Sequence, residues 1–536
     1  MIKPAFAAPS RAFVAGRSRD SPRTRPTPPA PSRPRRRPVH RSPDSAMTRA
    51  SKSRRAPSRR PGPPALDTAP PARRDGGAAP ADAALYRLRS DADMRQIAED
   101  VLAHARKVGA NDCTVDVDEG NGLTVNVRHG RIETIEQNHD KGVGVTVYVG
   151  AGHDVRRGNA STSDLTAAAL RAAVEAAYHI ARYTAVDAAA ALPDDDWYAR
   201  EPRDLDLFHP WNIEADAAAE IATRAEAAAL ETSPLIRNSE GGNVSVQHGR
   251  FVSANSRGFV GGHSHSYHSI AVAPIASRKG DGMQRDEWYA SRRDPADLPS
   301  PESVGRYAAE RTLARLGARK IDTCTVPVLF EAPLAAGLLG SYVGAASGRA
   351  LYRSSSFLMG KLDTRVFAEH IDIVDDPFVP KGMASGWFDD DGVATQRRAV
   401  VDGGVLTGWF LGAYSARKLG LPPTGNGGGA HNLSIRSRLT RPGDDFAAML
   451  EKLGTGLLVT ELMGQGVNMI TGDYSRGASG YWVENGVIAY PVEEVTIAGN
   501  LLDMFDRIVA VGTDLLTGGS RSTGSLLIES MTVAGN

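Results

Sequence analysis

The spacing of apolar residues predicts a first amphipathic helix at 91–109, followed by strands. Ile97, Val101 and Leu102 fall on one face of this helix, and Gly109 ends it. Beyond Gly109 the pattern changes to the alternation of a half-buried strand. This alternation predicts strands and hairpins in three stretches: CTVDVDEG (113–120), LTVNVRHGRIETIEQ (123–137, with its turn at His129–Gly130) and GVGVTVYVG (142–150).

Alanine-rich stretches farther along predict two long helices, at 165–183 and 213–231. Ser163 and Asp164 are placed to cap the first of them. Residues 234–275 return to a β pattern. A further helix is predicted at 302–317, where four apolar residues align: Val304, Tyr307, Ala308 and Leu316.

The second half of the chain is rich in glycine and in short apolar runs. A hairpin is predicted at 392–412, where Asp402, Gly403 and Gly404 supply the turn. A loop is predicted at 424–432, and several short strands at 454–491. The order of these elements predicts an α+β fold. Its two folded domains are an N-terminal helix/antiparallel-sheet domain, 86–318, and a Gly-rich, mostly β C-terminal domain, 319–536.

Residues 1–85 form an Arg/Pro-rich extension whose composition differs from the rest. Residues 1–82 hold 17 Arg and 2 Lys against 5 Asp, and 17 of the 33 prolines. So few large apolar residues predict disorder. The net charge of this stretch is +14, which leaves about −13 for the remainder of a chain with a net charge of +1. The extension is open to three interpretations: nucleic-acid binding, targeting, or a start codon called too early, with Met47 and Met94 as later candidates. We favour the last.

Composition also narrows the class of protein. A run of 18 apolar residues, as a transmembrane helix requires, does not occur in the sequence. Cys113 and Cys324 are the two cysteines of a long chain, which is typical neither of a disulfide framework nor of a thiolate-rich metal site. We therefore expect a cytoplasmic protein.

The histidine run HSHSYHS and the acidic run FDDDG are the two charged or metal-ligating clusters that stand out. In a strand, His263 and His265 share one face, as zinc ligands do, whereas His268 falls on the other face. We interpret this run as a polar, solvated strand. FDDDG (388–392) lacks the alternating ligands and distal Glu of a calcium loop, and we interpret it as a charged turn entering a hairpin.

Two further motifs carry candidate polar contacts. TGNGGGAHN (424–432) lacks the lysine of a phosphate-binding loop, so we interpret its glycines as room for another backbone. In TGDYSRGASG (471–480), Asp473 and Arg476 are expected to lie near each other on a short turn, where they form an ion pair or a turn-stabilising bond. GLLGSYVGAASG (337–348) has helical spacing, with Leu338, Leu339 and Val343 as its packing stripe. The residues alone do not assemble a complete catalytic constellation.

Seven longer motifs are specific enough to indicate a family. They are DLDLFHP (204–210), FDDDGVATQRR (388–398), YSARKLGL (414–421), TGNGGGAHN (424–432), GTGLLVTELMGQGVN (454–468), TGDYSRGASGYWVENG (471–486) and TIAGNLLDM (496–504). Together they resemble the TldD/PmbA family of bacterial proteins, which is implicated in peptide processing and was once described as modulators of DNA gyrase. The resemblance covers about residues 92–536 and leaves out the Arg/Pro-rich extension.

The resemblance implies a system of two subunits, of which one binds a metal. The TldD branch carries a helix with an HExxxH motif and, farther along the chain, a cysteine. The histidines bind a metal, and the glutamate takes a proton from water. This chain resembles the PmbA/TldE branch, the non-metal-binding one. Gly340 and Ala345 align with the two histidines, Ser341 aligns with the glutamate, and RSTGS (521–525) is nearest to the cysteine.

We therefore expect a subunit of a heterodimeric metallopeptidase that processes leader peptides and short unfolded peptides. The resemblance implies that this chain alone is inactive and holds no cofactor, that zinc sits in the TldD-type partner, and that this chain supplies interface and peptide cleft. The candidate peptide or partner contacts are Gly427, Gly428, His431, Asn432, Asp473 and Arg476. One alternative is a homodimer that sequesters peptides without hydrolysis. Another is a nucleic-acid-associated gyrase modulator, which the acidic body disfavours.

Overall fold

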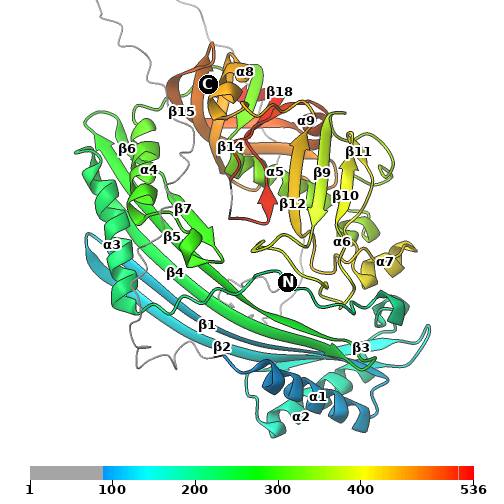
Figure 1. The fold of residues 1–536 in the computed structure, drawn as a ribbon. Helices are drawn as coiled ribbons and strands as arrows, with labels where there is room; N and C mark the ends of the chain where they lie inside the picture. Colours follow the sequence, from blue (N-terminus) through cyan, green and yellow to red (C-terminus); the bar gives the residue numbers. More distant parts are fainter. Residues whose placement is uncertain (1–87, 517) are drawn as a thin grey trace, which may run out of the picture. The chain divides into compact units, whose positions relative to one another are not determined.

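Long runs of alternating residues form an antiparallel sheet in the first half of the chain (Figure 1). The computed structural model describes residues 88–516 and 518–536, all within one structural unit. We call 88–318 the N-terminal region and 319–536 the C-terminal region. The sheet has the order β3-β2-β1-β4-β5-β6, and β7 also pairs with β5. Its strands are β1 (Asp112–Arg128), β2 (Arg131–Val149), β3 (Arg156–Thr162), β4 (Ile236–Asn255), β5 (Val260–Arg278), β6 (Gly282–Arg285) and β7 (Trp288–Arg292).

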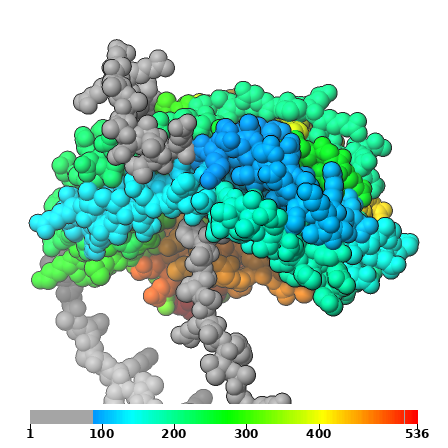
Figure 2. Space-filling view, turned by 90° about the horizontal axis from the view of Figure 1, so that it is seen from below, coloured from blue at the N-terminus to red at the C-terminus, as the bar shows by residue number. Residues whose placement is uncertain are grey.

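Two pairs of helices cover one face of this sheet. The odd-numbered residues of β1 point to this face: Cys113, Val115 and Val117 pack with α1 and α2, whereas Leu123 and Val125 pack with α3 and α4. The helices are α1 (Asp91–Lys107), α2 (Ala167–Tyr183), α3 (Ala215–Glu231) and α4 (Pro301–Ala314), with short 3-10 turns η1 (Ala188–Ala190), η2 (Asp195–Trp197) and η3 (Pro295–Asp297). Figure 2 shows the blue residues of α1 beside the cyan residues of the β1–β2 hairpin.

The predicted helices and strands of the N-terminal region are confirmed in type, with corrections to strand length and to one helix start. The stretches predicted at 113–120 and 142–150 are not separate strands, because β1 and β2 run without a break through them. The turn of the first hairpin lies at His129 and Gly130, whose φ angles are +49° and +68°. The second helix is capped by Thr166, whose hydroxyl accepts from the Ala169 N–H, and not by Ser163 or Asp164. Asp164 instead accepts from the Thr166 N–H. It therefore stabilises the turn before the helix.

The C-terminal region consists of a strand ring, a second sheet and the helix α5 (Ala332–Ala345) that packs with both. The ring is a sheet with the strand order β15-β14-β13-β8-β18 that closes on itself, because β15 also pairs with β18. Strand β16 pairs with β18 as well. The second sheet has the order β11-β10-β9-β12-β17. The strands are β8 (Cys324–Phe330), β9 (Ile371–Asp376), β10 (Arg398–Asp402), β11 (Val405–Leu406), β12 (Asn432–Ser437), β13 (Gly456–Met463), β14 (Asp473–Glu484), β15 (Val487–Asn500), β16 (Ile508–Val511), β17 (Arg521–Ser522) and β18 (Leu526–Ala534).

One large core joins these layers. Leu338, Leu339 and Tyr342 of α5 are buried in the same cluster as Ile373 of the second sheet and Leu457 of the ring. The remaining helices are short: α6 (Gly348–Tyr352), α7 (Ala413–Leu419), α8 (Phe446–Leu453) and α9 (Leu501–Asp506). This α+β architecture confirms the expected fold class.

A buried ion-pair network ties the N-terminal region to the start of α5. Arg311 of α4 donates from Nη1 to Glu331 Oε1 at 2.7 Å, and both side chains are about 5% exposed. Arg311 Nε also lies 3.3 Å from Asp286 Oδ2. Removing one member of such a buried pair costs more than the pair contributes, because the other charge stays buried. The start of α5 is therefore held firmly against α4.

The strands near the C-terminus are longer than predicted. β14 and β15 span 12 and 14 residues, so 454–491 does not consist of short strands alone. Their turn lies at Asn485 and Gly486, with φ angles of +51° and +76°. The helices of the described residues are all too short or too polar to cross a membrane. The predictions for residues 1–85 lie outside the described residues.

Candidate functional site

Helix α5 carries the residues that the family resemblance aligns with an HExxxH motif. The helix ends at Ala345, and Ser347 caps the next helix, α6, so the stretch 337–348 runs past the end of α5. Ala345 is fully buried in the core, whereas Gly340 and Ser341 are half-buried. The helix therefore presents Gly340 and Ser341 toward its less buried side.

The space beside Gly340 is filled by Arg521. A Cβ atom added at Gly340 would lie 3.1 Å from Arg521 Nη1 and 3.3 Å from its Cζ. Arg521 belongs to the RSTGS segment and sits on β17, which the parallel pairing with β12 holds beside α5. Although part of this side chain is exposed, desolvation lowers the pKa of the Arg521 guanidinium. A cation thus occupies the neighbourhood of Gly340.

These residues do not fit a metal ion. Gly340 and Ala345 have no side-chain donor atom, Ser341 offers a neutral hydroxyl, and Arg521 offers only N–H groups. Zinc sites in proteins use thiolate, imidazole or carboxylate ligands. Across residues 88–516 and 518–536, no group of three or more His, Cys, Asp or Glu side chains is placed to hold a metal. Both cysteines are free thiols.

The Gly-rich loop 424–432 packs against the acidic turn 388–392. The Gly427 N–H donates to Asp389 Oδ2 at 2.7 Å, and a Cβ at Gly427 would lie 3.0 Å from Asp391 Oδ2. A Cβ at Gly412 would lie 2.7 Å from the Gly427 Cα. The glycines therefore allow both a close backbone approach, as predicted, and contact with carboxylates, which the sequence did not indicate.

Asp389 is the buried centre of this turn. It is 4% exposed, and its Oδ1 accepts from the Asp391 and Val393 N–H groups at 2.9 Å each. Burial and the adjacent Asp391 carboxylate raise the pKa of Asp389 to about 8, against the opposing effect of its backbone N–H donors. The charged turn predicted here is present, but its first acid is buried rather than solvated.

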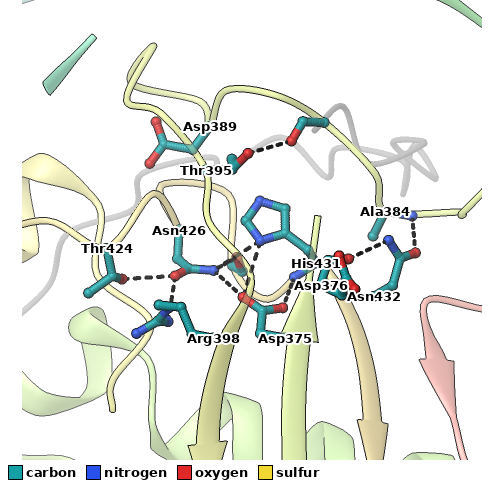
Figure 3. A network of polar contacts seen from close by, with 12 residues as sticks. Asp375, Asp376, Ala384, Asp389, Thr395, Arg398, Thr424, Asn426, His431 and Asn432 are labelled. Atoms are coloured by element: carbon teal, nitrogen blue, oxygen red, sulfur yellow. Dashed lines mark hydrogen bonds and ion pairs between the residues drawn. The ribbon is translucent and has the colours of Figure 1, made fainter. Parts of the chain in front are cut away.

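A buried polar network behind this loop centres on Asp375 and His431 (Figure 3). Asp375 Oδ1 accepts from the His431 N–H at 2.7 Å, and its Oδ2 lies 3.2 Å from His431 Nδ1 and accepts from Asn426 Nδ2 at 2.9 Å. Arg398 Nη2 and the Thr424 hydroxyl both donate to Asn426 Oδ1 at 2.8 Å. His431 Nε2 is buried without a hydrogen-bond partner among the described residues. The network fixes the ends of the Gly-rich loop.

His431 and Asn432 are neighbours in sequence but point to opposite sides of the sheet, as strand alternation requires (Figure 3). The Asn432 amide donates to the Asp376 carbonyl and to the Ser385 hydroxyl at 2.8 Å, and its Oδ1 accepts from the Ala384 N–H at 3.0 Å. Its hydrogen-bonding groups therefore hold the segment 376–385 in place.

Asp473 and Arg476 do not form an ion pair with each other, one of the two contacts expected for them. They lie on strand β14 rather than on a turn, and residues three apart on a strand face opposite ways. Asp473 accepts from the Thr471 hydroxyl at 2.6 Å and from Asn500 Nδ2 at 3.2 Å, and these bonds lower its pKa. Asp473 and Arg476 therefore do not form one joint binding site for a peptide or a partner.

The histidine run lies on β5, with His263 and His265 on one face and His268 on the other, as predicted. The run is less solvated than predicted, because His268 is fully buried and donates to or accepts from the His209 carbonyl at 2.9 Å through Nε2. Desolvation lowers the pKa of His263 to about 3, with His265 adding to the effect. The run packs as neutral imidazoles.

Sequence reasoning missed Asp375, Asn426 and Arg398. Asp375 lies in IDIVDD, whose alternation predicts a strand but gives no sign that this acid points into the core. Asn426 sits inside the glycine run, where the polar residue at the centre of TGNGGG is the one available signal. Their partners come from separate strands and loops, so spacing along the chain does not reveal the network.

Comparison with family models finds three matches along the chain. Residues 113–181 match domain 1 of the PmbA/TldA metallopeptidases, 208–316 match the central domain, and 323–535 match the C-terminal domain. The matched segments together include most of the described residues.

Individual relatives agree with these models. The Escherichia coli O157:H7 protein named metalloprotease PmbA is 45% identical over 82% of this chain and 97% of its own length. A Haemophilus influenzae homologue of that protein is 40% identical over 83% of this chain and 96% of its length. The crystal structure of a Bacteroides thetaiotaomicron protein, described as a candidate modulator of DNA gyrase, superposes with a TM-score of 0.78 at 26% identity, over 84% of this chain and 100% of that one.

Proposed function

Because the chain belongs to the PmbA/TldD family of metallopeptidases, we propose that it is the non-catalytic subunit of a peptidase whose metal is held by a partner. The partner is a TldD-type subunit that carries an HExxxH helix and zinc. The substrates are leader peptides and short unfolded peptides, and the complex is cytoplasmic. This chain contributes interface and peptide-binding surface.

The observation that supports this proposal is the combination of Gly340 and Arg521. A metallopeptidase needs about three protein ligands for its metal and a base that takes a proton from water. The α5 helix offers neither, and a guanidinium lies where a side chain at Gly340 would project. A cation at this place disfavours a metal ion through like-charge repulsion.

Co-purification tests the assembly. The full chain, tagged and recovered from its host, is expected to bring down a protein of similar size with an HExxxH motif. The isolated chain should hold no stoichiometric zinc and cleave no peptide, whereas the complex should hold zinc and lose its activity to a chelator. About one tightly bound zinc per isolated chain, together with chelator-sensitive cleavage, would overturn the proposal.

A matched pair of substitutions tests which subunit performs the chemistry. Ser341→Ala in this chain should leave the peptidase activity of the complex unchanged, because a hydroxyl on α5 takes no part in the proposed reaction. The change of the HExxxH glutamate to glutamine in the partner should abolish activity. If Ser341→Ala reduced activity as strongly as the partner's substitution, the non-catalytic role would be wrong.

The exposed part of the Gly-rich loop is the proposed contact surface. Gly427 and Gly428 are exposed, and a Cβ at Gly428 would meet only the exposed carboxylate of Asp390, at 2.8 Å. Gly428→Val is therefore expected to impair peptide processing or assembly more than it lowers the melting temperature. Unchanged processing and assembly in this variant would count against a contact role for the loop.

A further inference from the structure

The two faces of the β9–β12–β17 sheet have different surroundings. On one face, Ile373, Leu433 and Ile435 pack into the large core. On the other face, residues two apart along β12 line a cavity of about 430 Å³: Asn432, Ser434 and Arg436. Neighbouring strands extend this polar row, because Asp376 pairs with Asn432 and Ser522 pairs with Ser434. A cavity of this volume is within the usual range of small-ligand sites.

Residues of the N-terminal region, the segment 379–383 and residues 516 and 518–520 form the other walls of the cavity. Lys381 Nζ lies 2.7 Å from Asp294 Oδ2 and 2.9 Å from Asp297 Oδ2, which joins the two regions. Arg293 is 8% exposed and donates to the carbonyls of Ser266, Gly382 and Met383 at 3.0–3.2 Å. These contacts hold the walls at fixed positions around the sheet face.

The cavity carries an excess of positive charge. Its lining includes the cations Arg292, Arg293, Lys381, Arg397 and Arg436 and the acids Asp297 and Asp376. Lys381 pairs with Asp294 and Asp297, and Arg397 Nε pairs with Asp376 Oδ2 at 3.0 Å. Arg293 and Arg436 have no ion pair with any carboxylate of the described residues. Their charges remain to be balanced.

Arg293, which is buried, and Arg436, which is exposed, have different roles in the cavity. Desolvation lowers the pKa of Arg293 to about 10, because its charge is surrounded by carbonyl groups and by no carboxylate. Arg436 is exposed, and the hydroxyls of Ser434 and Ser522 make no hydrogen bond to the described residues beside it. A guanidinium with two nearby hydroxyl donors is suited to bind an anion.

We propose that this cavity binds a carboxylate of a peptide, with Arg436 as its ion-pair partner and the Ser434 and Ser522 hydroxyls as hydrogen-bond donors. Arg293 contributes a fixed positive charge behind them. The carboxylate is either the C-terminus of the peptide or an Asp or Glu side chain. The choice of a peptide rests on the proposed function, whereas the preference for an anion rests on the charges and hydroxyls of the cavity.

Direct binding to the isolated full chain tests this inference. A short, uncharged peptide with a dye at its N-terminus is prepared in three forms: free C-terminal acid, C-terminal amide, and amide with one internal Glu. Fluorescence anisotropy should show at least about tenfold tighter binding of one acidic form than of the plain amide, since an added charge-assisted contact has this order of effect. The acidic form that binds identifies the source of the carboxylate.

Arg436→Gln should remove this difference while leaving the melting temperature unchanged, because Arg436 is exposed and unpaired within the described residues. Arg349→Gln is the matched control, since Arg349 is also exposed but lies outside the cavity. Equal binding of all three peptides, or wild-type binding by Arg436→Gln, would overturn the inference. Displacement of the acidic peptide by inorganic phosphate at lower concentration than by acetate would overturn the carboxylate assignment.

The outcome is separable from that of the proposed function. Binding needs neither partner nor metal, so its failure leaves partner-dependent cleavage to be judged on its own. Conversely, a chain that binds the acidic peptide but never assembles with an HExxxH subunit would retain the carboxylate site and lose the proposed function.

Discussion

Glycines on α5 and in the 424–432 loop make room for groups of opposite charge. Gly340 faces the guanidinium of Arg521, whereas Gly427 faces the carboxylates of Asp389 and Asp391. The guanidinium is the end of a long, partly exposed side chain and is able to move. Asp389 is buried and held by backbone N–H groups. The loss of stability on adding a side chain at a glycine therefore depends on how rigidly the neighbouring group is held.

The largest effect on stability is expected at Asp375, whose carboxylate accepts hydrogen bonds from the Gly-rich loop. Asp375→Ala leaves the His431 N–H without its buried acceptor and removes one of the acceptors of Asn426 Nδ2, which keeps the Gly429 carbonyl. This should lower the free energy of unfolding by about 3 kcal/mol. Urea unfolding measures the change. Asp376→Ala is the control, because Asp376 is half-buried and should cost less than about 1 kcal/mol. Equal losses in the two variants would contradict the central role of Asp375.

The next largest effect on stability distinguishes two glycines that lie near the acidic turn 388–392. Gly412→Ala places a Cβ 2.7 Å from the Gly427 Cα, where backbone must shift, and should cost about 2 kcal/mol. Gly428→Ala meets only the exposed Asp390 side chain and should cost less than about 0.5 kcal/mol. Both values come from chemical denaturation. A Gly428→Ala loss as large as that of Gly412→Ala would show that the acidic turn is rigid throughout.

A smaller effect concerns pH. The pKa of Asp389 is raised to about 8 in the folded protein, above the value of about 3.9 in an unfolded chain, so the folded state binds more protons between these values. The contribution of Asp389 to stability should therefore fall as pH rises, by up to about 1 kcal/mol between pH 7 and 8. The buried histidines His248, His263 and His265 oppose this fall, because their lowered pKa values keep them neutral in the folded protein while the unfolded chain still binds some protons near pH 7.

Asp389→Asn keeps the histidines and should remove the fall that Asp389 causes over this interval, whatever it does to the stability itself. The measurement is the free energy of unfolding at several pH values between 7 and 8 for both proteins. Parallel curves for the variant and the unmodified protein would mean that another group carries the proton.

The smallest effect is expected at α5. Gly340→Ala gains helix propensity, and its Cβ displaces only the end of Arg521, so stability should change by less than about 0.5 kcal/mol. Gly337→Ala faces open space and should stabilise by up to about 1 kcal/mol. Adding Arg521→Ala should remove any cost at Gly340. A loss that persists in this double variant would show that something other than Arg521 fills the space.

Local patterns in the sequence determine much of the N-terminal region. The helix at 91–107 and the hairpin that turns at His129 and Gly130 follow from periodicity and turn chemistry, which involve residues close together in the chain. The same holds for the turn at 403–404. The family motifs, being long and ordered, also indicated the family that the comparisons show.

Only the tertiary structure decided what surrounds each candidate residue. The closure of the ring by β15 and β18, the placing of Arg521 beside Gly340, and the meeting of Asp375 with His431 all join segments far apart in sequence. The cavity at Arg436 likewise takes its walls from both regions. A glycine or an aspartate has the same local pattern whether its neighbour is a cation, a carboxylate or water. Burial and partner are set by the packing of whole layers, which periodicity along the chain does not encode.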